Sequence, residues 1–93
     1  MKPTVLFVDD VPNILSGLRR NMRRMKNEWD LAFAESGAEA LELAQTNDIA
    51  VVVTDMRMPV MDGTQLLEKM AKASPTTVRF ILSGESSRGS VPS

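Results

Sequence analysis

The stretch Ala50–Gly63, AVVVTDMRMPVMDG, decides how the rest of the chain is interpreted. It opens with an apolar run, as expected for a central parallel strand that helices cover on both faces. The run leads to a lone carboxylate, Asp55, after which Pro59 and Gly63 indicate a sharp loop. The pattern predicts a buried strand that presents one acid at the edge of a sheet.

A second acidic point follows another apolar run, Val5–Val8, where Asp9 and Asp10 stand side by side. In open α/β sheets, sites form outside the carboxyl ends of the strands. We therefore expect Asp9, Asp10 and Asp55 to form one site with three carboxylates. The hydroxyl of Ser83 ends a further apolar run and is expected at the same edge.

The remaining pattern predicts alternating strands and helices. Strands are expected at 4–8, 29–34, 50–54 and 77–82, and helices at about 12–26, 36–47 and 64–73. Ser36 and Glu39 have the spacing of a capping box, whereas Asp62 and Gly63 have the pattern of a turn. This order is typical of an α/β protein with a doubly wound parallel sheet. The apolar stripe of the first helix is expected to comprise Ile14, Leu15, Leu18, Met22 and Met25.

The composition limits the classes of function. The chain has 93 residues, is 43% hydrophobic and carries a net charge of -1, which argues against nucleic acid or an anionic membrane as a partner. Cysteine and histidine are both absent, which excludes disulfides, thiol catalysis and the usual transition-metal ligands. A metal would therefore be a hard cation with oxygen ligands, such as Mg²⁺. The first apolar run is too short for a signal peptide or a membrane span, so a cytoplasmic location is expected.

The acidic site suggests phosphoryl chemistry. Clustered carboxylates repel one another unless a cation joins them, and Mg²⁺ commonly bridges carboxylates and phosphates. A carboxylate can also act as a nucleophile and form an aspartyl-phosphate. Asp55 is the candidate because it stands alone after the most apolar strand, and Ser83 could donate a hydrogen bond to a phosphoryl oxygen.

Three motifs at consistent spacing, VLFVDD (5–10), VVVTDMRMPVMDG (51–63) and ILSG (81–84), make the sequence similar to the CheY-like receiver domains of two-component response regulators. The resemblance implies a flavodoxin-like sheet of strand order 2-1-3-4 within a receiver domain at 1–84. Residues 85–93 are expected to be a disordered or vector-derived tail.

The resemblance also implies roles for individual residues. Asp55 would accept a phosphoryl group from the phosphohistidine of a sensor kinase or phosphotransfer protein. Asp10 would bind Mg²⁺ directly, Asp9 mainly through water, and the backbone carbonyl of Arg57 would be a further ligand. The hydroxyl of Ser83 would bond the phosphoryl group. Such a signalling domain is not a conventional enzyme and at most catalyses its own Mg²⁺-dependent phosphorylation and dephosphorylation.

One departure from the family affects these expectations. The family implies a further strand that ends in lysine, but no lysine follows Lys72. The sequence is therefore expected to be a C-terminally truncated receiver with impaired phosphotransfer. The strand at 77–82 would then be an exposed apolar edge, which can template pairing with another chain. The alternative function is a self-associating or domain-swapped module, a homodimer through this strand, without phosphotransfer.

Other interpretations stay open. Asp9 or Asp10 could cap the first helix, and Asp55 could be an ordinary turn residue. The arginines and lysines of the first helix could form a solvated face or a surface that docks a partner. A metal-dependent phosphohydrolase with an aspartate nucleophile would carry a second aspartate two residues later. This chain has Arg57 there, which argues against that class.

Overall fold

The computed structural model describes residues 2–82, so Ser83, Gly84 and the expected tail lie outside the described residues. The strands form one parallel sheet in the order β2-β1-β3-β4, which confirms the predicted doubly wound α/β fold and its strand order. The elements in chain order are β1 (Thr4–Val8), α1 (Pro12–Asn21), the 3₁₀ helix η1 (Arg23–Asn27), β2 (Asp30–Ala34), α2 (Gly37–Thr46), β3 (Ile49–Asp55), α3 (Gly63–Ala73) and β4 (Val78–Leu82).

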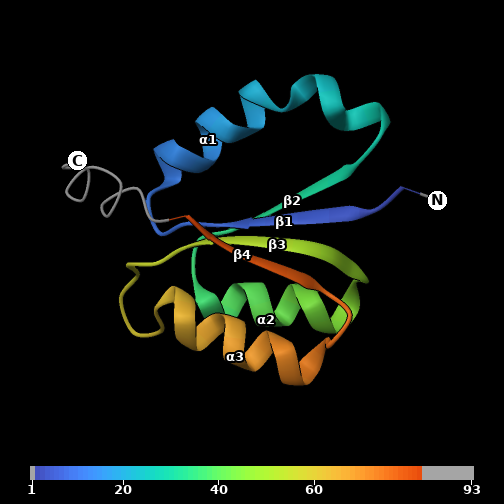
Figure 1. Cartoon of the computed structure of the whole chain (residues 1–93). Helices are drawn as coiled ribbons and strands as arrows, with labels where there is room; N and C mark the ends of the chain where they lie inside the picture. The colour runs from blue at the N-terminus through green and yellow to red at the C-terminus, as the bar shows by residue number, and fades with distance from the viewer. Residues whose placement is uncertain (1, 83–93) are drawn as a thin grey trace, which may run out of the picture.

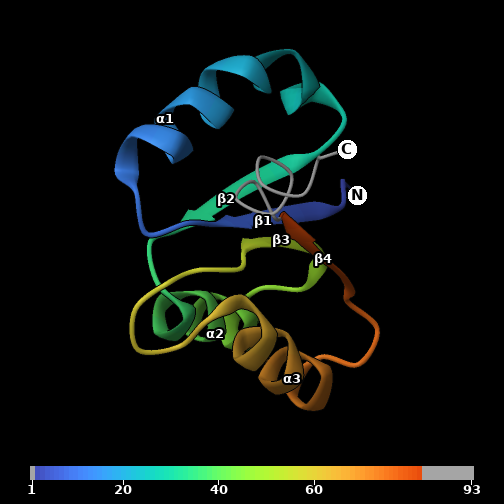
Figure 2. The same ribbon diagram turned by 60° about the vertical axis from the view of Figure 1, so that its left-hand side comes forward.

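Helices cover both faces of the sheet, with α1 on one face and α2 and α3 on the other (Figures 1 and 2). Because successive side chains of a strand point to opposite faces, β1 supplies both layers. Leu6 and Val8 pack in the cluster beneath α2 and α3, whereas Val5 and Phe7 pack with Leu15 of α1. Each helix within residues 2–82 falls short of the length and apolar character needed to cross a lipid bilayer.

The first helix is shorter than predicted. It ends at Asn21, and Met22 leaves the helical region with φ -95° and ψ 8°. The chain then tightens into η1, where the N–H of Met25 donates to the Met22 carbonyl at 2.9 Å, three residues back. Ile14 is 48% exposed and does not join the apolar stripe, because only Leu15 of the adjacent pair faces the sheet and is buried.

The helix starts differ in their capping. Ser36 Oγ accepts a hydrogen bond from the Glu39 N–H at 3.1 Å, but the Glu39 carboxylate accepts from the Glu35 N–H and not from Ser36. The predicted capping box at α2 is therefore only half correct. The complete box lies at α3, where Asp62 and Gln65 each accept from the other's backbone N–H at 2.8 and 3.0 Å. Asp62, expected in a turn, is thus the N-cap.

A buried threonine attaches β4 to the rest of the sheet. The Thr77 hydroxyl donates to the Ile49 carbonyl at 2.7 Å and lies 2.6 Å from the Ser74 hydroxyl. These bonds hold the start of β4 against the start of β3, which sets the register in which Val51 lies opposite Val78.

Within the described residues, β4 pairs only with β3 and forms one edge of the sheet. Its side chains Val78, Phe80 and Leu82 are 51%, 54% and 50% exposed, respectively. They point to the face on which α1 lies, but α1 packs over β1 and β2 and leaves this part of the sheet uncovered (Figure 2). This observation agrees with the apolar edge that the sequence predicted.

Candidate functional site

The sheet topology brings the three predicted carboxylates together. β1 and β3 are neighbouring parallel strands in which Val8 lies opposite Thr54, so Asp9 and Asp10 follow β1 beside the end of β3. Asp55 is the last residue of β3. Each of the three aspartates contributes one carboxylate oxygen to a group whose members lie within 4.8 Å of one another. The arrangement is the kind of all-oxygen donor set that binds a hard cation.

Asp9 is held in place by the loop that precedes α1. Its Oδ1 accepts a hydrogen bond from the Val11 N–H at 2.9 Å, and its own N–H donates to the Ala34 carbonyl at 3.1 Å. Val11 is the N-cap residue of α1 and provides no side-chain cap, so neither Asp9 nor Asp10 occupies the capping position proposed as an alternative. The Asp9 carboxylate is thereby fixed to its loop.

Asp55 experiences opposing electrostatic effects. Burial raises the pKa of the Asp55 carboxyl above its ordinary value of 3.8, and the negative charges of Asp9 and Asp10 raise this pKa further. Backbone hydrogen bonds from Met56 and Arg57 favour the ionised form and lower the pKa of Asp55. A cation between the carboxylates would remove the repulsion that these residues share, so the site is chemically suited to a divalent metal.

The loop after β3 is packed closely against the end of β3, where Asp55 lies. The Gly63 N–H donates to the Met56 carbonyl at 2.9 Å, and a Cβ atom at position 63 would lie only 2.6 Å from the Asp55 carbonyl oxygen. Further along the loop, the Met61 N–H donates to the Pro59 carbonyl at 2.7 Å. Val60 between them has φ 70°, a strained value for a β-branched residue, and its side chain is fully exposed.

The other two predicted site residues are placed differently. Arg57 lies two residues beyond Asp55 in this loop, with an exposed side chain. Ser83, the predicted hydroxyl donor, lies outside the described residues. Sequence reasoning missed the two backbone N–H groups that favour ionised Asp55, because no residue pattern marks them. It did predict that Gly63 shapes the loop beside Asp55, and the structure adds the close approach of Gly63 to the Asp55 carbonyl oxygen.

Comparison with known proteins supports the same assignment. The model of the response regulator receiver domain family matches residues 5–91. The transcriptional regulatory protein GlrR of Escherichia coli (strain K12) is 35% identical over 88 residues, which cover 95% of this chain and 19% of GlrR. The transcriptional regulatory protein PrrA of Mycobacterium bovis is 35% identical over 91% of this chain and 36% of PrrA.

A solved structure gives the same result. The signal receiver domain of an HD domain-containing protein from Pseudomonas fluorescens Pf-5 superposes with a TM-score of 0.84 at 30% identity, over 90% of this chain and 66% of that one. The chain thus spans only about a fifth to a third of the two curated relatives, at 19% and 36% of their lengths.

Proposed function

The chain belongs to the response regulator receiver domain family, the signalling domains of two-component systems, and we propose that Asp55 is its phosphoacceptor. Receiver domains of this family partner with histidine kinases or phosphotransfer proteins, and such a protein would be the phosphoryl donor here. The observation that carries the proposal is the convergence of Asp9, Asp10 and Asp55 within 4.8 Å at the carboxyl edge of the sheet.

In the proposed reaction, an oxygen of ionised Asp55 attacks the phosphorus of a phosphohistidine. The new P–O bond forms as the P–N bond breaks, and the electron pair of that bond stays with the imidazole of the donor. Asp55 must be ionised to attack, and its hydrogen bonds with the backbone of Met56 and Arg57 favour that form. The hydroxyl of Ser83 remains the candidate donor to a phosphoryl oxygen.

The donor set fits Mg²⁺, for which Asp9, Asp10 and Asp55 would supply carboxylate oxygens and Arg57 its backbone carbonyl. When bound, Mg²⁺ would offset the negative charge of the transferred phosphoryl group. Burial is the main reason that the pKa of Asp55 is raised, and the negative charges of Asp9 and Asp10 raise it further; a cation bound here would relieve that second, repulsive part.

The test is labelling with acetyl phosphate and Mg²⁺, followed by mass spectrometry of the intact chain. We expect one added phosphoryl mass on only a fraction of the molecules, in keeping with the impaired phosphotransfer that the sequence predicts, and we expect Asp55→Asn to abolish it. Asp48→Asn is the matched control, because Asp48 is exposed and lies outside the acidic cluster. Equal labelling of the wild type and Asp55→Asn, or no labelling even at high acetyl phosphate, would refute Asp55 as the acceptor.

A second candidate function, self-association through β4, is favoured by the exposed side chains of Val78, Phe80 and Leu82. In an antiparallel pair of β4 strands centred on Phe80, each Val78 would lie opposite the Leu82 of the other copy. Each Arg79 would lie opposite Ile81, so no like charges would face each other across the new pair. The pairing would extend the sheet and cover the apolar side chains with their own counterparts.

Size-exclusion chromatography with light scattering tests the dimer. We expect a dimer at micromolar concentration and a monomer for Phe80→Lys, because lysine at the centre of an edge strand opposes pairing. Val60→Lys is the control, since Val60 is also apolar and exposed but lies in the loop before α3. A folded monomer of the wild type at these concentrations would exclude the dimer and leave the phosphoacceptor proposal untouched.

A further inference from the structure

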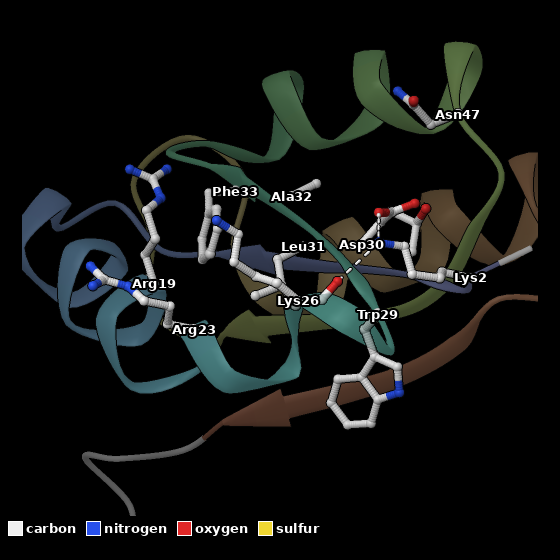
Figure 3. Close-up of a pocket in the computed structure, with 11 residues that line it drawn as sticks. Lys2, Arg19, Arg23, Lys26, Trp29, Asp30, Leu31, Ala32, Phe33 and Asn47 are labelled. Carbon is white, nitrogen blue, oxygen red and sulfur yellow. Dashed lines mark hydrogen bonds and ion pairs between the residues drawn. The ribbon is translucent and has the colours of Figure 1, made fainter.

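A hollow of about 570 Å³ runs along the second edge of the sheet, beside β2. Four consecutive residues of this strand line it, from Asp30 to Phe33, so the hollow follows the strand edge and does not sit over one face. Figure 3 shows the cations of α1 and η1 on one side of β2 and Asn47, at the end of α2, on the other. None of the three clustered aspartates lines it.

The backbone along this edge has groups that lack a strand partner. The Asp30 N–H donates to the Pro3 carbonyl and the Ala34 carbonyl accepts from the Asp9 N–H, so these two residues direct their backbone toward β1. Because the direction of the backbone groups alternates along a strand, the N–H and C=O groups of Leu31 and Phe33 point into the hollow. Within residues 2–82, no strand lies on that side of β2.

The rim of the hollow is basic. Its lining includes four cations against one acid, Asp30, and that acid is already paired with Lys2 at 3.4 Å. The guanidinium of Arg19 lies 4.5 Å from the centre of the Phe33 ring, which holds a positive charge directly above the strand. Among the residues that the structure describes, no carboxylate pairs with Arg19, Arg23 or Lys26.

The two sides of the strand differ in chemistry. Leu31 and Phe33 point toward α1, where the cations lie, whereas Ala32 points toward α2 and contributes only a methyl group. A strand added here would therefore meet positive charge on one face and the small side chain of Ala32 on the other. Acidic side chains suit the first face, and aliphatic side chains suit the second.

We propose that this β2-edge groove binds an acidic partner peptide in extended conformation, which adds as a strand beside β2. The peptide would bond the N–H and C=O groups of Leu31 and Phe33, as in other cases of strand addition. Its acidic side chains would contact Arg19, Arg23 and Lys26, and aliphatic side chains between them would cover Ala32. The site is independent of Asp55, so Asp55→Asn should leave peptide binding unchanged.

The probe is a peptide of about eight residues with alternating Glu and Val, titrated against the 93-residue chain. Trp29 lines the groove and is the only tryptophan, so its fluorescence reports binding. We expect amide shifts at Leu31 and Phe33 in NMR spectra. Arg23→Glu should weaken binding roughly three- to tenfold, as expected when a rim ion pair becomes a repulsion. Arg24→Glu is the matched control, because Arg24 is exposed in η1 but does not line the groove.

Three results would overturn the proposal. Equal losses for Arg23→Glu and Arg24→Glu would show that only net charge matters. Undiminished binding of a peptide with methylated amides at alternate positions would exclude strand addition. A single-stranded oligonucleotide that competes for the groove and shifts the Trp29 signal, but not the Leu31 and Phe33 amides, would indicate a nucleic-acid surface instead.

Discussion

Gly63→Ala tests whether the loop after β3 is shaped by its contact with the end of that strand. The added Cβ atom would lie 2.6 Å from the Asp55 carbonyl oxygen and 3.0 Å from the Met56 Cα atom. Non-bonded heavy atoms prefer a separation of about 3.5 to 4 Å, so the backbone must move by several tenths of an ångström. Both contacted atoms belong to the backbone, so no side-chain rotation can relieve them.

The cost follows from comparable overpacking. Inserting a carbon atom into a tightly packed site costs about 1 to 3 kcal/mol. Gly17→Ala is the matched control, because Gly17 lies within α1 and a Cβ there would have no neighbour within 4 Å. That change should stabilise the protein by up to about 1 kcal/mol, the difference in helix propensity. The free energies of unfolding of the two variants should therefore differ by roughly 1 to 4 kcal/mol, although both carry the same Gly→Ala change.

The assay is urea unfolding followed by Trp29 fluorescence and circular dichroism. For a chain of this size, 1 kcal/mol corresponds to about 4 to 8 °C in Tm, so thermal unfolding gives an independent check. Movement of the Asp55 backbone should also weaken Mg²⁺ binding by Gly63→Ala, whereas Gly17→Ala should not change it. Equal stability of the two variants would refute the argument that this glycine is required by space.

Three further changes test other contacts. Without divalent cations, Asp55→Asn should stabilise the protein increasingly as pH rises. Because the pKa of Asp55 is raised in the folded state, the contribution of this carboxyl to wild-type stability is fully present below 3.8 and is lost as the carboxyl ionises. A constant difference in free energy of unfolding between the two proteins, measured with urea at pH 3.5 and pH 7, would contradict this. Thr77→Val should lower the free energy of unfolding by about 1 to 3 kcal/mol, because the Ile49 carbonyl loses the hydroxyl that donates to it. Thr76 is exposed, so Thr76→Val should change the same free energy little. Val60→Gly should raise Tm by an amount equivalent to about 0.5 to 1 kcal/mol, because glycine tolerates φ 70° and the Val60 side chain is fully exposed, so its loss removes no packing. A lower Tm would show that the backbone at Val60 is not strained.

Local patterns were sufficient for most of the elements. The apolar runs before Asp9 and Asp55 predicted two strands, and the alternation of strands with amphipathic segments predicted the parallel sheet, whereas the strand order was implied by the resemblance to receiver domains. Errors occurred where two local signals compete. The apolar spacing of Met22 and Met25 suits an α-helix and a 3₁₀ helix almost equally, so the end of α1 could not be read from it.

The sequence by itself determined which strands carry acids at their carboxyl ends, because a strand's composition and its terminal residue are properties of a few adjacent positions. Only the tertiary structure decided how those acids interact, since the raised pKa of Asp55 depends on burial and on the charges of Asp9 and Asp10, which follow a different strand. The β2-edge groove is also tertiary in origin. Its cations come from α1, η1 and the residues before β1, and no spacing along the chain reveals that packing places them along one strand edge.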